Sequence, residues 1–183
     1  VFTIKCPTLI CRAFFFMNNY KNFLKSFKNS VQLVERNLED IELIAVSKKK
    51  PSSDIQEVIN HGHVSFGENQ IQEIENKWPS LKKLNPDTKL NFIGSIQSRK
   101  VKSIYENCEV IHSIDRMKLV KLFSELEQSR NLNRKYFIQI NTGNEPQKSG
   151  VLFNDAEKFL DDCKAYSNLS IVGLMCLPPI EDN

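Results

Sequence analysis

The stretch IELIAVSKKKP (residues 41–51) is an apolar run of strand length that ends abruptly in three lysines and a proline. Runs of this kind, rich in β-branched residues and bounded by polar or glycine-containing loops, recur along the chain and predict strands. They cover residues 41–46, 64–66, 89–93, 109–112, 136–140 and 169–174. Because a lysine at the end of a buried strand suits carbonyl chemistry, the first run also gives a candidate site.

Helical patterns separate the predicted strands, with apolar residues three or four positions apart. Their faces are Ile55/Val58/Ile59, Ile71/Ile74/Trp78, Leu119/Leu122/Phe123/Leu126 and Ala156/Phe159/Leu160/Cys163. A longer face, from Tyr20 to Leu38, predicts an N-terminal helix that begins at Met17. Strands that alternate with helices predict an α/β fold with parallel strands and right-handed crossovers.

A closed barrel is favoured over an open doubly wound sheet, because no G-x-G-x-x-G follows the first predicted strand and polar loops follow the strand ends. The predicted fold class is therefore a (β/α)8 barrel of the TIM type. Such a barrel takes about 200 to 250 residues, whereas this chain has 183 and ends just beyond its sixth predicted strand. We therefore expect a barrel truncated after about six βα units, from a fragment of a longer gene product.

Residues 1–16 (VFTIKCPTLICRAFFF) begin with valine rather than methionine, and Met17 opens an ordinary amphipathic helix. We interpret them as an upstream extension outside the natural protein, the alternative being a targeting segment, and we assign residues 17–183 to a partial barrel domain. The apolar part, residues 7–16, is too short to span a bilayer and contains Arg12, so no membrane partner is expected.

Composition excludes one function class and indicates a compartment. Lys and Arg number 25 against 22 Asp and Glu, a net charge of +3, and the basic residues are scattered, so nucleic acid is not an expected partner. The five cysteines form no C-x-x-C pair and mostly lie in apolar contexts, which suits a reducing cytoplasm.

Strand alternation distinguishes the three lysines. If Lys48 points into the barrel, Ala45 and Ser47 face the surrounding helices and Lys49 points outward. Pro51 begins the next predicted helix, so Lys50 belongs to the loop before it. An amine must lose its proton before it attacks a carbonyl carbon, and burial beside other cations favours the neutral amine. Lys48 is therefore the candidate nucleophile, and the alternative reading is a solvated basic turn.

Six ordered motifs resemble the pyridoxal phosphate homeostasis proteins over nearly everything from about residue 30 onward. They are AVSKKKP (45–51), FGENQIQE (66–73), NFIGSIQSRKVK (91–102), IHSIDR (111–116), INTGNEPQKSG (140–150) and GLMCLPP (173–179). The resemblance implies the barrel of the N-terminal domain of alanine racemases. It also implies pyridoxal 5′-phosphate (PLP) as cofactor, held as a Schiff base by the lysine after A-V-S, which is Lys48 here.

Further cofactor contacts are expected at the ends of the other predicted strands. Glu68 and Asn69 end the second, and both are expected to face the cofactor, although Asn69 also suits an ordinary turn. The remaining candidates are Gly94, Ser95, His112, Asn141 and Met175. Gly94 permits close backbone approach, whereas His112 also suits a structural role and Met175 a core position.

The sequence departs from the family pattern in two small ways and one large one. Asn91 stands where a histidine is usual, and Arg99 where an asparagine is usual. The family continues through two further βα units, whose loops hold the phosphate at helix N-termini and whose arginine lies near the pyridine nitrogen. We expect the truncation to weaken cofactor binding and to leave unpaired strand edges that invite aggregation.

The resemblance implies a PLP-binding protein of intracellular PLP homeostasis, which carries the cofactor and passes it to client enzymes without strong turnover. One alternative is a PLP-dependent amino-acid racemase, although the chain lacks a second domain to supply a tyrosine base. Another is a Schiff-base aldolase on a similar barrel. A third is a non-enzymatic anion-binding module built on Lys48, Lys49 and Lys50.

Overall fold

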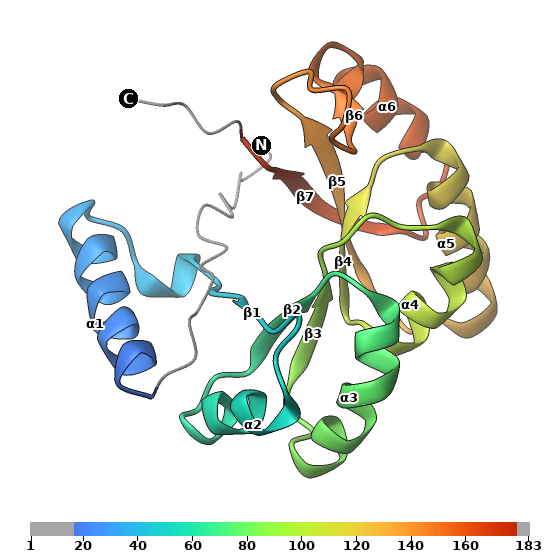
Figure 1. The fold of residues 1–183 in the computed structure, drawn as a ribbon. Helices are drawn as coiled ribbons and strands as arrows, with labels where there is room; N and C mark the ends of the chain where they lie inside the picture. The colour runs from blue at the N-terminus through green and yellow to red at the C-terminus, as the bar shows by residue number, and fades with distance from the viewer. Residues whose placement is uncertain (1–16, 179–183) are drawn as a thin grey trace. The chain divides into compact units, whose positions relative to one another are not determined.

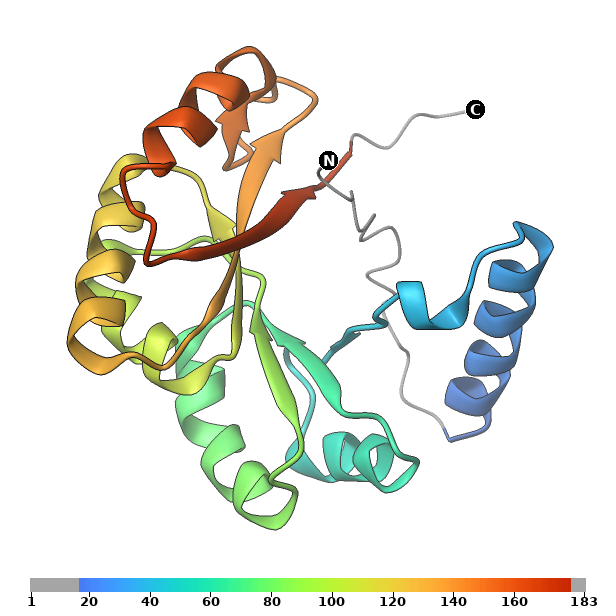
Figure 2. The same ribbon diagram turned by 180° about the vertical axis from the view of Figure 1, so that it is seen from behind.

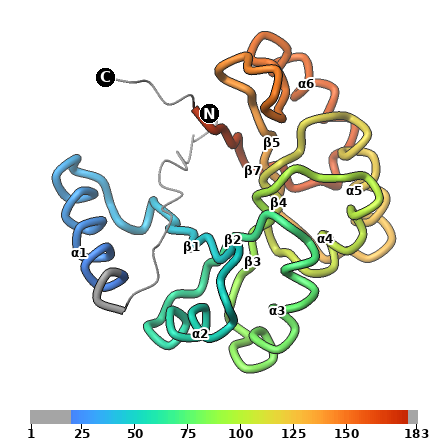
Figure 3. Tube along the Cα trace, in the orientation of Figure 1, coloured from blue at the N-terminus to red at the C-terminus, as the bar shows by residue number. Residues whose placement is uncertain are grey.

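The structure, a computed structural model, describes residues 17–178, which form two compact units divided between Leu90 and Asn91. We call residues 17–90 the N-terminal unit and residues 91–178 the C-terminal unit. Strands and helices alternate along both (Figures 1 and 3). The prediction about residues 1–16 lies outside the described residues. Within residues 17–178, no helix is both long and apolar enough to cross a membrane.

The N-terminal unit begins with helix α1 (Met17–Leu33), which buries Tyr20 and Val31. The helix ends there because Glu35 adopts a left-handed backbone (φ 52°), and its amide and the next one donate back to carbonyls of the last turn. Val34 and Leu38 are therefore 64% and 36% exposed. The prediction of one helix face that continues to Leu38 is wrong at its C-terminal end.

The rest of this unit alternates strands with helices. The elements are η1 (Leu38–Asp40), β1 (Ala45–Val46), α2 (Ser52–Asn60), β2 (Ser65–Glu68), α3 (Ile71–Leu84) and the start of β3 (Lys89–Phe92). β1 and β2 are parallel, with Ala45 opposite Phe66, and the Phe66 ring lies 5.2 Å from the Trp78 ring of α3. The predicted α3 face is confirmed, because Ile71, Ile74 and Trp78 are all buried.

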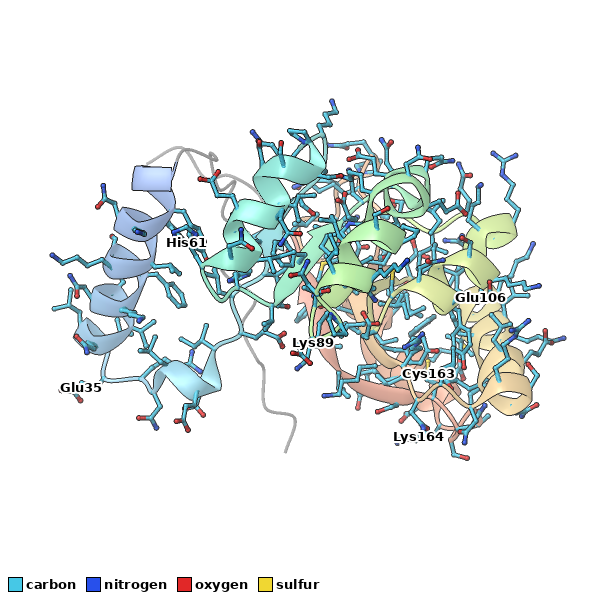
Figure 4. The ribbon with its side chains drawn as sticks, turned by 90° about the horizontal axis from the view of Figure 1, so that it is seen from below. Glu35, His61, Lys89, Glu106, Cys163 and Lys164 are labelled. Atoms are coloured by element: carbon cyan, nitrogen blue, oxygen red, sulfur yellow. The ribbon has the colours of Figure 1, made fainter. Side chains whose placement is uncertain are left out.

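Aromatic contacts connect α1 with the loop between α2 and β2. The Tyr20 ring lies edge-on to His61, at 6.4 Å, and to His63, at 5.9 Å. Figure 4 shows His61 beside α1. His63 also packs edge-on against Phe66 at 5.2 Å, and its Nε2–H donates to the Ser65 carbonyl at 2.7 Å. Burial lowers the pKa of His63, although this hydrogen bond and the charge of Glu42 act in the opposite direction.

The lowered pKa of His63 predicts acid sensitivity of this packing. The unfolded chain takes up the proton near pH 6.5, before the folded protein does, so the stabilisation is complete above that pH and decreases as the pH falls through it. We expect the urea concentration at the unfolding midpoint to decrease when the pH is lowered from about 8 to about 6. The decrease should be smaller in His63→Gln. Equal decreases in the two proteins would contradict this account.

The C-terminal unit continues the alternation with the end of β3. Its elements are η2 (Ser98–Lys100), α4 (Val101–Asn107), β4 (Val110–Ile114), α5 (Met117–Arg130), β5 (Lys135–Asn141), β6 (Val151–Leu152), η3 (Phe153–Asp155), α6 (Ala156–Cys163) and β7 (Ser170–Cys176). The strands pair in parallel, with β5 between β4 and β7. α4, α5 and α6 lie on one side of them (Figures 1 and 2).

Strand β6 is an element that the sequence did not predict. The pairing of β4 with β5 ends at Ile138. β6 pairs with the next part of β5, at Ile140 and Asn141. It therefore supplies hydrogen-bond partners to the last residues of β5. Two residues are too few to show an alternating pattern, so this strand could not be predicted from periodicity.

Candidate functional site

Lys48 lies in a tight turn directly after β1. The Ser47 amide donates to the Gly67 carbonyl at 2.9 Å, and the Lys50 amide donates back to the Ser47 carbonyl at 3.1 Å. Lys49, at the second central position, has a left-handed backbone with φ of 58°. Lys48 is half-buried, whereas Lys49 is exposed. We call residues 47–50 the lysine turn.

Strand alternation separates the residues around the lysine turn into two faces. Ala45 is opposite Phe66, which packs on Trp78 of α3, and the Ser47 hydroxyl donates to Glu68 Oε1 at 2.8 Å. Ala45 and Ser47 therefore face the helices, as predicted. Val46 lies opposite Gly67 on the other face, and by the same alternation Lys48 is the next residue on that face.

The Glu68 side chain is fully buried on the helix side of β2. Its Oε1 accepts hydrogen bonds from Ser47 and from the Trp78 indole, at 3.2 Å for the latter, and forms an ion pair with Lys77 at 2.7 Å. The expectation that Glu68 faces the cofactor together with Asn69 is therefore wrong, because adjacent strand residues point to opposite faces. Its second oxygen, Oε2, is buried without a hydrogen-bond partner among the described residues.

Asn69 follows directly after β2. It is half-buried, and its Oδ1 is buried without a hydrogen-bond donor among the described residues. A buried amide oxygen without a partner is unusual and indicates a position that a donor group can fill. Asn69 thus presents a free acceptor at the end of the strand that pairs with β1.

Two side chains of α3 contact the backbone of the lysine turn. Glu73 Oε2 accepts a hydrogen bond from the Lys49 amide at 2.6 Å, and Lys77 Nζ donates to the Ser47 carbonyl at 3.0 Å. Neither residue was predicted from the sequence to have a role at the site. Their spacing of four along a helix, which brings opposite charges together, was the available signal.

In the C-terminal unit, His112 is a packed strand residue. It is 6% exposed, its ring stacks on Phe137 at 4.6 Å with an interplanar angle of 2°, and its Nε2 bonds to Asn91 Oδ1 at 2.9 Å. These contacts favour the structural reading of His112. Asn91, which stands where the family usually has a histidine, is thus a polar partner in the packed strands.

Of the remaining predicted contacts of this unit, Ser95 and Asn141 contact the loop after β5, whereas Gly94 contacts β4. Ser95 Oγ lies 2.9 Å from Ser149 Oγ, and the Ser113 hydroxyl donates to the Gly94 carbonyl. Asn141 Nδ2 donates to the Glu145 carbonyl at 2.9 Å, and its Oδ1 accepts from the Glu145 amide at 3.2 Å. Both polar atoms of the Asn141 side chain therefore form hydrogen bonds within the loop that follows β5.

Met175 is buried in β7 opposite Gln139, whose side-chain amide donates to the Ser149 carbonyl. Met175 and Gln139 therefore share a face of the β5–β7 pair, next to the loop that ends at Ser149. Within residues 17–178, no three His, Cys, Asp or Glu side chains gather as metal ligands would.

This chain is similar to known proteins in sequence and in fold. The family described as alanine racemase, N-terminal domain, matches residues 24–183. The pyridoxal phosphate homeostasis protein of Vibrio alginolyticus is 32% identical over 162 residues, which cover 87% of this chain and 70% of that protein. The Buchnera aphidicola protein of the same name is 33% identical over 169 residues, which cover 90% and 73%.

Two solved structures extend this result. PipY of Synechococcus elongatus, solved with PLP bound, is 28% identical, with a TM-score of 0.72 over 84% of this chain and 71% of that one. An alanine racemase of Clostridium difficile, with 10% identity and a TM-score of 0.62 over 85% of this chain and 40% of that one, shares the fold alone.

These matches define the class as proteins with the barrel of the alanine racemase N-terminal domain. The predicted fold class, a partial TIM-type α/β barrel, is thereby confirmed. Within that class, this chain belongs to the pyridoxal phosphate homeostasis proteins, the family that its motifs resemble. The cofactor contacts predicted at individual residues stay predictions.

Proposed function

We propose that this protein binds PLP at the carboxyl end of β1, holds it through the Lys48 amine, and serves intracellular PLP homeostasis. The observation that carries the proposal is the half-buried Lys48 in a hydrogen-bonded turn at a strand end, in a chain whose relative PipY was solved with PLP bound. When bound, PLP supplies an aldehyde whose carbon can be joined to a lysine nitrogen with loss of one water.

The residues near Lys48 fit such a ligand. Asn69 Oδ1, buried without a donor among the described residues, can accept a hydrogen bond from the ring hydroxyl of PLP. The lysine turn fixes the backbone from which the Lys48 side chain extends. Gly94, Ser95, His112, Asn141 and Met175 stay proposed contacts, of which His112 and Asn141 would act mainly by holding the strands and the loop in place.

The role we propose is that of a carrier, which keeps a reactive aldehyde bound and releases it to client enzymes. The tyrosine hydroxyls of Tyr105 and Tyr136 both donate to Glu127, which favours a structural role for them over proton transfer. The proposed compartment is the cytoplasm, a reducing environment in which thiols such as those of Cys163 and Cys176 stay reduced.

Lys48→Ala tests the proposal. We expect the purified protein to take up PLP and turn yellow, and Lys48→Ala to lose that absorbance completely, because the nitrogen that holds the aldehyde is gone. Lys49→Ala is the matched control from the same turn, because the Lys49 backbone amide keeps its hydrogen bond to Glu73 when the exposed side chain is truncated, and it should stay yellow. An unchanged spectrum in Lys48→Ala would overturn the proposal. Rapid exchange of the Cα proton of alanine would instead favour a racemase.

A further inference from the structure

The backbone of the lysine turn is held by side chains from another element. Three of its polar backbone groups contact α3: the Lys49 amide donates to Glu73 Oε2 at 2.6 Å, and Lys77 Nζ donates to the carbonyls of Ser47 at 3.0 Å and Lys50 at 3.4 Å. The carboxylate thus binds the middle of the turn, and the ammonium binds both of its ends.

The two side chains also hold each other. Glu73 and Lys77 lie one helical turn apart and form an ion pair at 2.8 Å, and Lys77 pairs with the fully buried Glu68 at 2.7 Å. The side chains of Lys77 and Glu73 are only 13% and 21% exposed. This pair is therefore shielded from solvent, unlike an ordinary surface ion pair, which contributes little.

The turn needs such support for two reasons. Lys49 adopts a left-handed backbone, which is unfavourable for a residue with a Cβ atom. Three successive lysines also repel one another, and the carboxylate of Glu73 offsets the charge of Lys49. Burial acts to raise the pKa of Glu73, but the Lys77 and Lys49 hydrogen bonds and charges outweigh it and lower the pKa, which keeps the carboxylate ionised at neutral pH.

We propose that Glu73 and Lys77 are positioning residues that fix the lysine turn and thereby make Lys48, rather than its neighbours, the lysine that attaches PLP. The proposal rests on the proposed function and deepens it. Neither residue needs to contact the cofactor. Their effect passes through the backbone of residues 47–50, whose fixed conformation holds the Lys48 side chain at one place and the exposed Lys49 side chain at another.

The test measures where and how strongly PLP attaches. Each protein is mixed with PLP, reduced with borohydride, digested, and analysed for pyridoxyl groups on Lys48, Lys49 and Lys50. We expect Glu73→Ala and Lys77→Met to lower the equilibrium constant for attachment at Lys48 about tenfold, the loss expected for one hydrogen bond to a charged group. We also expect them to move part of the label to Lys49 and Lys50.

Control variants separate positioning from folding. Glu73→Gln keeps an acceptor for the Lys49 amide and should retain the Lys48 selectivity that Glu73→Ala loses. Gln72→Ala, at the exposed neighbouring position of α3, should behave as the wild type. Circular dichroism identifies folded variants, and if Glu73→Ala does not fold, the comparison of Lys77→Met, which removes the donor, with Lys77→Arg, which keeps one, decides by the same label mapping.

The outcomes distinguish this proposal from the proposed function. Wild-type label on Lys48 with unchanged strength and selectivity in the folded Glu73 and Lys77 variants would overturn the positioning role alone. Absence of label from Lys48 in the wild type would overturn the proposed function, and the positioning role with it. Weaker attachment in Glu73→Ala with restored selectivity in Glu73→Gln supports the positioning role.

Discussion

Glu127→Ala is expected to lower the free energy of unfolding of the C-terminal unit by about 3–5 kcal/mol, the cost of removing one partner from a buried charged network. Glu127 is 5% exposed, and its carboxylate accepts four hydrogen bonds. The donors are the hydroxyls of Tyr105 and Tyr136, both at 2.9 Å, and the amides of Asn133 and Arg134, at 3.1 and 2.8 Å.

Removal of this carboxylate leaves buried donors without an acceptor and releases the loop between α5 and β5. That loop depends on it, because Asn131 and Asn133 have left-handed backbones with φ of 51° and 56°. Urea unfolding followed by circular dichroism measures the loss. Glu125→Ala, at an exposed position of the same helix, should change the stability by less than about 0.5 kcal/mol. Equal small effects of both substitutions would show that the network contributes little.

Trp78→Ala is expected to cost the N-terminal unit about 3–5 kcal/mol, the range for truncation of a buried aromatic side chain. Trp78 is 1% exposed, packs against Phe66, and donates its indole N–H to Glu68 Oε1. The substitution opens a cavity beneath β2 and removes one donor from a buried carboxylate. Far-UV circular dichroism must report unfolding, since Trp78 is the one tryptophan of the chain and its fluorescence is lost.

Trp78→Phe separates the two contributions. It keeps an aromatic ring beside Phe66 but removes the N–H group, so we expect a smaller loss of about 1–3 kcal/mol, the cost of an unsatisfied buried polar group. If Trp78→Phe were as destabilising as Trp78→Ala, the hydrogen bond to Glu68 would account for the whole effect. If Trp78→Ala were nearly neutral, the packing account of β2 and α3 would be wrong.

The sequence predicted most of the fold because alternating apolar runs and helical faces repeat so regularly. The predicted strand at residues 89–93 corresponds to β3 (Lys89–Phe92), and the α3 face was read correctly. The face of α5 was predicted only in part: Leu119 and Phe123 are buried as expected, but Val120, Ser124 and Glu127 are buried as well. A polar residue is predicted to be exposed unless its partners are known, and the partners of Glu127 come from α4 and from the residues that follow α5.

The site was predictable only in part. Lys48 could be located because its strand ends visibly in the sequence, and alternation placed Ser47 on the helix side correctly. The same alternation places the side chains of Glu68 and Asn69 on opposite faces, so the prediction that both face one ligand was inconsistent with strand geometry. Contacts of Glu73 and Lys77 with the lysine turn join residues 24 to 30 positions apart, and periodicity within one element carries no such information.

Peptide mapping of the wild-type protein after incubation with PLP and borohydride reduction tests the central claim most directly. The account predicts a single pyridoxyl group, on Lys48. A pyridoxyl group on another lysine of the intact protein, or none on any, would contradict it.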